Sequence, residues 1–285
     1  MGFSAYYAAD GRVLPPILAP PESDTHKYAR GHALIFSGPE LATGASRLAA
    51  EAALRIGAGL VTIVGEKAAL REHAAHVSAI MLREEGEDDP LSDRRTASVL
   101  IGPGAGRGGA TRNRTLRLLN RGCAALLDAD ALTSFADEPD ALFSALHDQC
   151  VLTPHEGEYG RLFPDISLID RDEAALAASE RAGSIVLLKG SRTSIAAPDG
   201  RLAYNDHSSP WLATAGSGDT LGGMIAGFLA QGCDPFDAAA MASWLHGEAG
   251  LRAGAGLTAD DLPLLIPSIL ADLPEWHGGD NGKVH

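Results

Sequence analysis

Short runs of apolar residues, each followed by a glycine-rich or polar loop, most limit how this chain can fold. Runs that are apolar at nearly every position are typical of strands buried on both faces, as they are in a parallel sheet. Between the first two runs, apolar residues at helical spacing indicate a strand-helix-strand unit, whose short connections suit parallel strands. The runs span residues 32–37, 60–64, 98–101, 124–128, 150–152 and 185–188. They predict an α/β fold with a mostly parallel central sheet.

One domain is expected to account for most of the chain. Its 285 residues, 45% of them hydrophobic, are enough for one large core, and we find neither an internal repeat nor a convincing linker. We expect a single domain over residues 26–273, an N-terminal extension over 1–25 and a flexible tail over 274–285. Because residues 1–24 hold two Pro-Pro pairs, we expect them to run over the surface before the core begins. The acidic stretch 84–93 is predicted to be a solvated loop.

Further elements follow from local patterns. Apolar spacing predicts helices over residues 111–121, 236–250 and 257–273. Residues 194–197 and the turn 198–200 indicate a hairpin after the last of the apolar runs.

Charge and cysteine content argue against several kinds of protein. The formal net charge is −14, whereas nucleic acids and anionic membranes are bound by clustered lysines and arginines. The three cysteines, Cys123, Cys150 and Cys233, are odd in number and far apart, which indicates neither a disulfide framework nor a zinc site. The N-terminal residues show no basic segment followed by an apolar one, as a signal peptide would, and no apolar run reaches the length of a membrane span. We therefore expect a cytoplasmic protein.

The stretch Ala213–Gly223 predicts a tight glycine loop that opens into a helix. The first N–H groups of a helix are unpaired and lie at the positive end of its dipole, and glycines there let a phosphate approach the main chain. Gly216, Ser217 and Gly218 are therefore candidates for an anion hole. Asp219 would repel a phosphate unless it takes a proton from an attacking hydroxyl, so it is a candidate base. Alternatively, Asp219 caps the helix and the glycines only form a turn.

Other polar residues after the predicted strands each have a functional and a structural interpretation. Asp128 and Asp130 could hold Mg²⁺ through water or cap the next helix. His155 could touch a substrate, or it could belong to a helix start that Glu156 and Glu158 stabilise.

Two more loops could bind a ligand. The glycine loop 102–106 follows a predicted strand and would face the carboxyl edge of the sheet, although its spacing is not that of a dinucleotide fingerprint. Lys189 and Arg192 are positively charged residues in a chain with few of them. They could bind a nucleotide phosphate, or they could lie on a solvated hairpin edge. Because all these loops follow successive strands, they could share one edge of one sheet.

Taken together, the loops make the sequence resemble the ADP- or ATP-dependent NAD(P)H-hydrate dehydratases. GSGD alone is shared with kinases of the same superfamily, whereas the long forms around it and around His155 are far more specific, and the kinases tend to have asparagine where His155 stands. The resemblance covers about residues 26 to 273 and implies a ribokinase-like three-layer α/β/α fold. Its motifs are HKYARGHALIFSG, GASRLAAEAALRIGAGLVTI, LIGPGAG, LTPHEGEYGRLF, LLKGSRTSIAAPDGR and WLATAGSGDTLGGMIAGFLAQG. Residues 27–31 depart from the family's K-G-x-x-G.

The resemblance implies a repair reaction. ADP or ATP would phosphorylate the ring hydroxyl of hydrated NADH or NADPH, and the phosphate would leave as the double bond re-forms. Asp219 would be the catalytic base, Mg²⁺ would screen the nucleotide, and Glu158 would lie near the metal. Hydrate contacts carry over onto Ala45, Gly104, His155 and Asp219. Nucleotide contacts carry over onto Lys189, Gly190, Ser191, Arg192, Thr193 and Gly218.

Several matters stay open at this point. The implied substrate is the S-epimer of the hydrate, and about 25 leading residues are too few for the epimerase domain of some relatives, so a separate epimerase is expected. The resemblance also implies a homotetramer. It does not decide between NADH and NADPH hydrate or between ADP and ATP. A small-molecule kinase of the same fold and a non-catalytic adenylate sensor remain alternatives.

Overall fold

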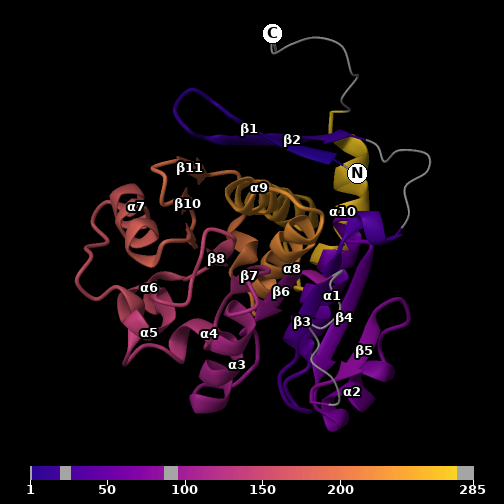
Figure 1. Cartoon of the computed structure of the whole chain (residues 1–285). Helices are drawn as coiled ribbons and strands as arrows, with labels where there is room; N and C mark the ends of the chain where they lie inside the picture. The colour runs from indigo at the N-terminus through magenta and orange to yellow at the C-terminus, as the bar shows by residue number, and fades with distance from the viewer. Residues whose placement is uncertain (1, 20–26, 87–95, 275–285) are drawn as a thin grey trace.

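The computed structural model describes residues 2–19, 27–86 and 96–274. Its centre is a nine-stranded sheet in the order β11-β10-β9-β8-β7-β6-β3-β4-β5 (Figure 1). Strands β3 to β9 run parallel to one another. At one edge of the sheet, β10 pairs antiparallel with β9, and β11 pairs antiparallel with β10. The bounds are β3 His32–Phe36, β4 Leu60–Gly65, β5 Met81–Glu84, β6 Thr96–Ile101, β7 Ala124–Leu127, β8 Cys150–Leu152, β9 Ile185–Leu188, β10 Thr193–Ala196 and β11 Leu202–Asn205. The predicted sheet, its six strands and the hairpin after them are confirmed.

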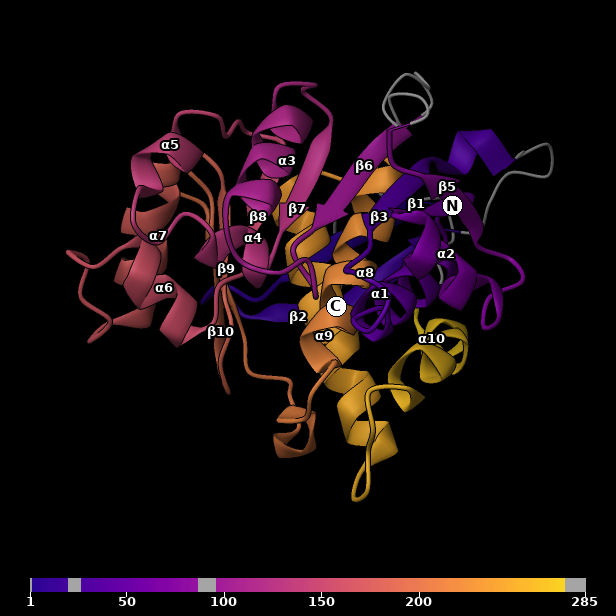
Figure 2. The ribbon, with the colours of Figure 1, turned by 90° about the horizontal axis from the view of Figure 1, so that it is seen from below.

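Helices cover both faces of the sheet, which confirms the three-layer α/β/α architecture (Figures 1 and 2). One face is covered by α1 Gly44–Arg55, α8 Ser217–Ala230, α9 Pro235–Ala253 and α10 Asp261–Asp272. The other is covered by α3 Gly109–Leu119, α4 Asp130–Thr133, α5 Pro139–Phe143, α6 Glu156–Leu162 and α7 Arg171–Ala182. A further helix, α2 Lys67–Ala74, packs beside β4 and β5.

The central strands are mostly apolar because both of their faces are buried. In β3, Ala33 and Ile35 belong to the core under α1 and α8, whereas Leu34 and Phe36 belong to the core on the opposite face. This alternation with a period of two residues places successive side chains on opposite faces of the sheet. A continuous apolar run is therefore what a central strand of this fold requires.

Glycines let α8 approach α1 closely. A Cβ added to Gly223 would lie 2.1 Å from the carbonyl oxygen of Ala49, and one added to Gly227 would lie 2.3 Å from Cγ2 of Ile56. The small residues of α1 complete this contact. The helix that begins with the glycine loop is thus held tightly against its neighbour.

We expect Gly223→Ala to lower the free energy of unfolding by at least about 2 kcal/mol, because the new methyl group meets backbone atoms of Ala49. Gly160→Ala is the matched control, since Gly160 lies in α6 and an added Cβ there has no neighbour within 4 Å. The control is expected to be neutral or to stabilise by up to about 1 kcal/mol. Denaturant titrations of both variants measure the difference, and equal stabilities would contradict the close approach.

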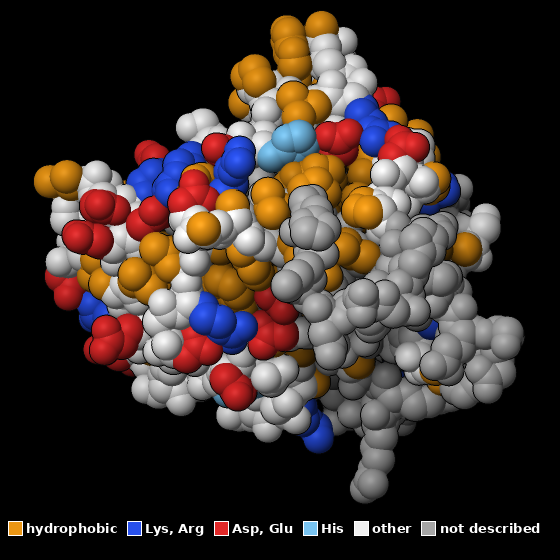
Figure 3. Space-filling model, turned by 90° about the horizontal axis from the view of Figure 1, so that it is seen from above, with side chains coloured by type: hydrophobic (Ala, Val, Ile, Leu, Met, Phe, Trp, Pro, Cys, Tyr) orange, Lys and Arg blue, Asp and Glu red, His pale blue; other side chains and the backbone are white. Residues whose placement is uncertain are grey.

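The N-terminal segment contributes to the core, so the prediction that it only runs over the surface is wrong for residues 2–19. Strands β1 Gly2–Tyr7 and β2 Val13–Ala19 form an antiparallel hairpin. Val13 is 3% exposed, and the ring of Phe3 meets Phe228 edge-on at 4.8 Å. The prolines are tolerated because Pro15 and Pro16 fall where the register of this two-stranded sheet is interrupted, between the pairs Tyr6–Leu14 and Ser4–Ile17. Seen from this end, hydrophobic side chains lie amid mixed acidic and basic ones (Figure 3).

Residues 27–31, where the chain departs from the family pattern, lie away from the carboxyl edge. They form the short 3-10 helix η1 Lys27–Arg30 and a turn that leads into the amino end of β3. Gly31 has a φ of 75°, and a Cβ there would lie 1.6 Å from the carbonyl oxygen of Ala230. This segment therefore has a packing role against the end of α8.

Other differences have local causes. The helix predicted over 257–273 begins at Asp261, because the carboxylate of Asp261 accepts hydrogen bonds from the amide and hydroxyl of Thr258 and holds a turn.

Residues 275–285 of the predicted tail and 87–93 of the acidic stretch lie outside the described residues. Glu85, at the start of that stretch, makes hydrogen bonds of 2.8 and 2.7 Å with Arg114. Within the described ranges, no helix is long and apolar enough to cross a membrane.

Candidate active site

Loops after five neighbouring parallel strands bring most of the predicted site residues to one edge of the sheet. Because these strands are parallel, their carboxyl ends all lie at that edge, where ligands of open α/β folds bind. Along the sheet, β9 leads to Lys189, β8 to His155, β7 to Asp128, β6 to Gly104 and β3 to residues 37–43. The predicted convergence of these loops is confirmed.

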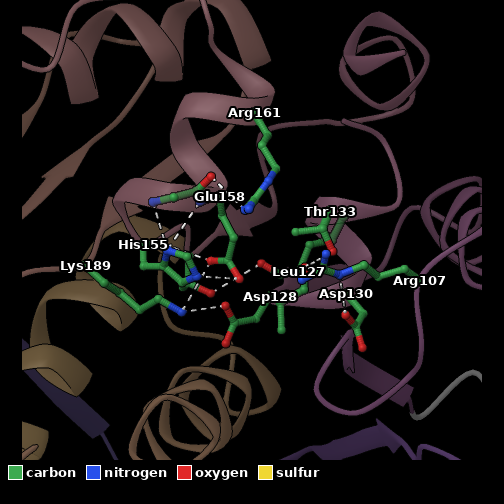
Figure 4. Close-up of polar contacts among 12 residues, drawn as sticks. Arg107, Leu127, Asp128, Asp130, Thr133, His155, Glu158, Arg161 and Lys189 are labelled. Carbon is green, nitrogen blue, oxygen red and sulfur yellow. Dashed lines mark hydrogen bonds and ion pairs between the residues drawn. The ribbon is translucent and has the colours of Figure 1, made fainter. Parts of the chain in front are cut away.

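A buried ion pair joins two of the loops. Nζ of Lys189 lies 2.7 Å from Oδ1 of Asp128 and 3.9 Å from Oε2 of Glu158, and the three side chains point toward one another in Figure 4. Burial tends to lower the pKa of Lys189, but the two carboxylates outweigh it and raise this pKa above its ordinary value. Lys189 is thus a fixed positive charge, and the alternative of a solvated hairpin edge is wrong for it.

The first turn of α8 lies beside this ion pair. Gly216 precedes the helix with a φ of 89°, a left-handed conformation that glycine adopts without strain. A Cβ added to Gly218 would lie 3.7 Å from Nζ of Lys189 and 4.0 Å from Oδ2 of Asp128. The predicted glycine loop opening into a helix is confirmed, and its N–H end is next to a lysine.

Asp219 is a partly buried carboxyl group in this first turn. Gly216 occupies the N-cap position with no side-chain cap, so the alternative that Asp219 caps the helix is wrong. Burial, with a smaller contribution from the charge of Asp128 and opposed by Lys189, raises the pKa of Asp219 to about 6. A carboxyl group with this pKa can accept a proton near neutral pH.

His155 and Glu158 stabilise the start of α6 together. Nδ1 of His155 accepts hydrogen bonds from the amides of Gly157 and Glu158 at 2.9 and 3.3 Å. In return, Oε2 of Glu158 accepts from the amide of His155 at 2.9 Å, which makes a capping box. The structural interpretation of His155 is therefore confirmed. The same histidine also lines the cavity described next, so the two interpretations do not exclude each other.

A cavity of about 610 Å³ opens beside the N-terminus of α8. Its walls include predicted nucleotide residues, a segment around the 3-10 helix η2 Pro210–Leu212, and α9. The predicted residues in the lining are His155, Lys189, Gly190, Ser191, Thr193, Ser217 and Gly218. The other predicted site residues are not in it: Ala45, Gly104, Glu158, Arg192, Gly216 and Asp219.

Arg192 is held outside the cavity. Its guanidinium donates two hydrogen bonds to Asp172, at 2.8 and 2.7 Å, and lies 4.0 Å from the centre of the Tyr204 ring. A planar guanidinium satisfied in this way by a carboxylate is not a free phosphate ligand. Its neighbours Ser191 and Thr193 line the cavity instead.

Two other loops meet farther along the same edge. A Cβ added to Gly104 would lie 3.8 Å from Cβ of Ala45, so these two predicted contacts are neighbours. Asp130 supports the glycine loop, because its Oδ2 accepts from the amide of Gly106 at 2.9 Å. The cap of α4 is Ala129, without a side-chain cap, so the capping interpretation of Asp128 and Asp130 is wrong.

Comparison with known proteins decides the family. A family model described as NAD(P)H-hydrate dehydratase matches residues 33–271. The chain belongs to the NAD(P)H-hydrate dehydratase family. An ADP-dependent (S)-NAD(P)H-hydrate dehydratase of Xanthomonas campestris is 35% identical to it, over 87% of this chain and 91% of the relative.

Other members of the dehydratase family are longer or structurally known. A bifunctional NAD(P)H-hydrate repair enzyme of Moorella thermoacetica is 38% identical over 89% of this chain and 52% of its own length. The chain thus spans about half the length of such bifunctional relatives. The structure of an ADP/ATP-dependent NAD(P)H-hydrate dehydratase from Bacillus subtilis, co-crystallised with ATP and Mg²⁺, superposes with a TM-score of 0.77 at 27% identity, covering 90% of this chain and 94% of that one. A ribokinase-like protein of Enterococcus faecalis, at 24% identity and a TM-score of 0.80, covers 91% and 93% and shows the same fold.

In this member of the dehydratase family, sequence reasoning missed Arg171, which joins two of the loops. Its guanidinium donates to the carbonyl oxygens of Leu188 and Lys189, at 3.3 and 2.9 Å, and to the Glu156 carboxylate at 2.5 Å. Arg171 is the first residue of α7, a helix that the sequence analysis did not predict. The sequence signal for this helix is Asp170, a residue type that often occupies the N-cap position. Its carboxylate accepts hydrogen bonds from the amides of Asp172 and Glu173.

Proposed function

We propose that this chain converts the S-epimer of NADH or NADPH hydrate back to the reduced dinucleotide, with ADP as the phosphoryl donor. The proposal rests chiefly on one observation: Asp219, with a pKa raised to about 6, lies in the first turn of α8 near the charge of Lys189. The name of the Xanthomonas relative, which matches nearly all of this chain, supports the substrate and the donor. The product is a repaired nicotinamide cofactor.

Asp219 is the proposed base of the first step. It takes the proton of the ring hydroxyl while the hydroxyl oxygen attacks the terminal phosphorus of ADP, and the bond from that phosphorus to the AMP oxygen breaks. The amides of Gly216, Ser217 and Gly218 and the ammonium of Lys189 stabilise the charge on the transferred group. In the second step the ring carbon–oxygen bond breaks, orthophosphate leaves, and the ring loses a proton as the double bond re-forms. Hydrate and ADP thus give reduced dinucleotide, AMP and orthophosphate.

The two substrates would approach the anion hole from different parts of the edge. The cavity lined by Lys189, Gly190, Ser191 and Thr193 suits the nucleotide. The region of Ala45 and Gly104 suits the hydrate, and His155, which lines the cavity, would contact the hydrate from the side of the nucleotide. Asp219 does not line the nucleotide cavity, as expected of a base that acts on the other substrate.

The residues present fit a hydrated Mg²⁺ held mainly by the nucleotide. Among the described residues, no three His, Cys, Asp or Glu side chains form a preformed metal cluster. Mg²⁺ commonly keeps several waters and uses one or two carboxylates together with substrate phosphates. Asp128, which pairs with Lys189 through Oδ1, would offer Oδ2, and Glu158, engaged by His155, would act through water. When bound, the ion would screen the phosphate charges.

A small-molecule kinase of the same fold is the alternative. It would carry out the first step and release a stable phosphorylated alcohol. His155, in the position where the kinases tend to have asparagine, and the match to the dehydratase family model favour the dehydratase.

We further propose a homotetramer that works in the cytoplasm together with an epimerase activity. The bifunctional names of longer relatives support a functional link with an epimerase activity. Sedimentation analysis tests the assembly, and a monomer at micromolar concentration would contradict the tetramer.

Activity is expected to fall as the pH drops below about 6, because a base must be unprotonated and burial raises the pKa of Asp219 to about that value. Below this pH, kcat/KM for the hydrate should decrease by about tenfold per pH unit. A steady-state pH profile measures this acid limb, the decrease of kcat/KM at low pH. The residual rate of Asp219→Asn is the control and should show no such decrease. A limb centred near the ordinary pKa of aspartate would contradict the role of burial.

The activity itself is tested by mixing the protein with the S-epimer of NADH hydrate, Mg²⁺, and ADP or ATP in separate cuvettes. We expect the near-ultraviolet absorbance of the dihydronicotinamide ring to rise with ADP. NADPH hydrate in a parallel series measures the substrate preference. No rise with either nucleotide, while ADP still binds, would overturn the proposal and favour the kinase.

A further inference from the structure

A histidine outside the predicted site contacts the anion hole. His246, in the middle of α9, lines the cavity together with Ser217. Its Nε2 lies 2.9 Å from Oγ of Ser217 and 3.0 Å from the carbonyl oxygen of the same residue. One ring nitrogen thus meets two oxygens of the residue that begins α8.

The carbonyl oxygen determines which nitrogen of His246 carries the proton. A carbonyl oxygen can only accept, so Nε2 must be the donor. Burial, opposed by the hydrogen bond to Ser217 and assisted by the charge of Lys189, lowers the pKa of His246 to about 4. The ring is therefore neutral near pH 7, with its single N–H directed at Ser217.

This tautomer determines what the Ser217 hydroxyl can do. Because Nε2 donates, Oγ of Ser217 accepts from the histidine, and its own hydrogen is left for another acceptor. Within residues 2–19, 27–86 and 96–274, no other hydrogen bond of this hydroxyl is observed. Ser217 is 4% exposed and lines the cavity, so the available acceptor is a group bound there.

We propose that His246 is a positioning residue that turns the Ser217 hydroxyl into a hydrogen-bond donor for a phosphate oxygen of the nucleotide. The inference rests on the proposed function, because it takes the occupant of the cavity to be a nucleotide. It adds a side-chain donor to the backbone amides of the anion hole. A charged acceptor makes such a hydrogen bond stronger than a neutral one.

A double-mutant cycle on ADP binding tests the pairing. Calorimetric titration with ADP and Mg²⁺, without hydrate, should show roughly tenfold weaker binding for Ser217→Ala and for His246→Leu. The double variant should be no weaker than either single variant, because both remove the same hydrogen bond. His246→Gln, whose amide can supply an N–H donor, should recover most of the affinity. Thermal unfolding of each variant checks that the fold is kept.

Adenosine is the control ligand, because it has no phosphate. Its affinity, followed by ligand-observed NMR, should be nearly unchanged in Ser217→Ala and His246→Leu. Equal losses for adenosine and ADP, or additive losses in the double variant, would overturn the inference and leave the proposed function standing. Failure of the wild-type protein to bind ADP at all would overturn both. If His246→Leu fails to fold, Ser217→Ala with the two ligands still decides whether the hydroxyl meets a phosphate.

Discussion

Asp219→Asn is expected to lower kcat by roughly 10²–10⁴-fold, which is the contribution of a general base. Asparagine keeps the size of the side chain but cannot take the hydroxyl proton. ADP affinity should stay nearly unchanged, since Asp219 does not line the nucleotide cavity. Steady-state kinetics and calorimetric titration of the same preparation measure the two quantities. Loss of ADP binding in parallel with turnover would contradict the assignment of Asp219 as a base.

The same variant should be more stable than the wild type at high pH. The folded-state pKa of Asp219 is raised from 3.8 to about 6, so the folded protein binds the proton more tightly than the unfolded chain. This group therefore adds stability below its unfolded pKa and loses that contribution as the pH rises through about 6. Above that pH, Asp219→Asn should gain up to about 3 kcal/mol. Denaturant titrations at pH values on either side of the transition measure the gain, and equal stability of the two proteins at high pH would contradict the burial of a charged carboxylate.

Lys189→Met is expected to be the most destabilising change in the site. It leaves Asp128, 2% exposed, and Glu158, 5% exposed, without their shared positive charge. Breaking a buried ion pair by removing one partner costs about 3 kcal/mol or more. Because Lys189 lowers the pKa of Asp219, the acid limb of the rate profile should also move to higher pH.

Lys67→Met is the matched control for this prediction. Nζ of Lys67 lies 3.9 Å from Glu84, but the lysine side chain is 66% exposed. A solvated pair of this kind contributes less than about 1 kcal/mol. Denaturant titrations compare the two variants, and a similar loss in both would show that the pair between Lys189 and Asp128 is not desolvated in solution.

The central sheet could be predicted because its strands carry their own signal. A strand buried on both faces is apolar at nearly every position, as β3 is from Ala33 to Phe36, and that run is visible without any partner. The hairpin of β1 and β2 was not predicted because Pro15 and Pro16 indicate a surface segment. They lie in a two-stranded sheet, where each strand has an outer edge whose residues need no N–H group to pair with a further strand. Strand β5 ends in Arg83 and Glu84 and lies at a sheet edge, so it lacks the apolar run.

The candidate site was predictable where its residues directly follow strands. Asp128 and Lys189 do so, His155 comes shortly after β8, and the parallel order of the strands brings the three together. Arg171 and His246 act through contacts with residues 18 and 29 positions away, Lys189 and Ser217, on elements that pack only in the folded protein. The Arg192 contact with Asp172, 20 positions away, is of the same kind. No spacing rule in a single sequence predicts such contacts.

The most direct test of the account is the fate of the phosphoryl group in one reaction mixture. Phosphorus NMR can follow ADP, AMP, orthophosphate and any phosphorylated hydrate while absorbance follows the dihydronicotinamide ring. We predict that orthophosphate, AMP and NADH form in equal amounts, with no lasting phosphorylated intermediate. Accumulation of a stable phosphorylated alcohol without orthophosphate or NADH would contradict the dehydratase and identify a kinase.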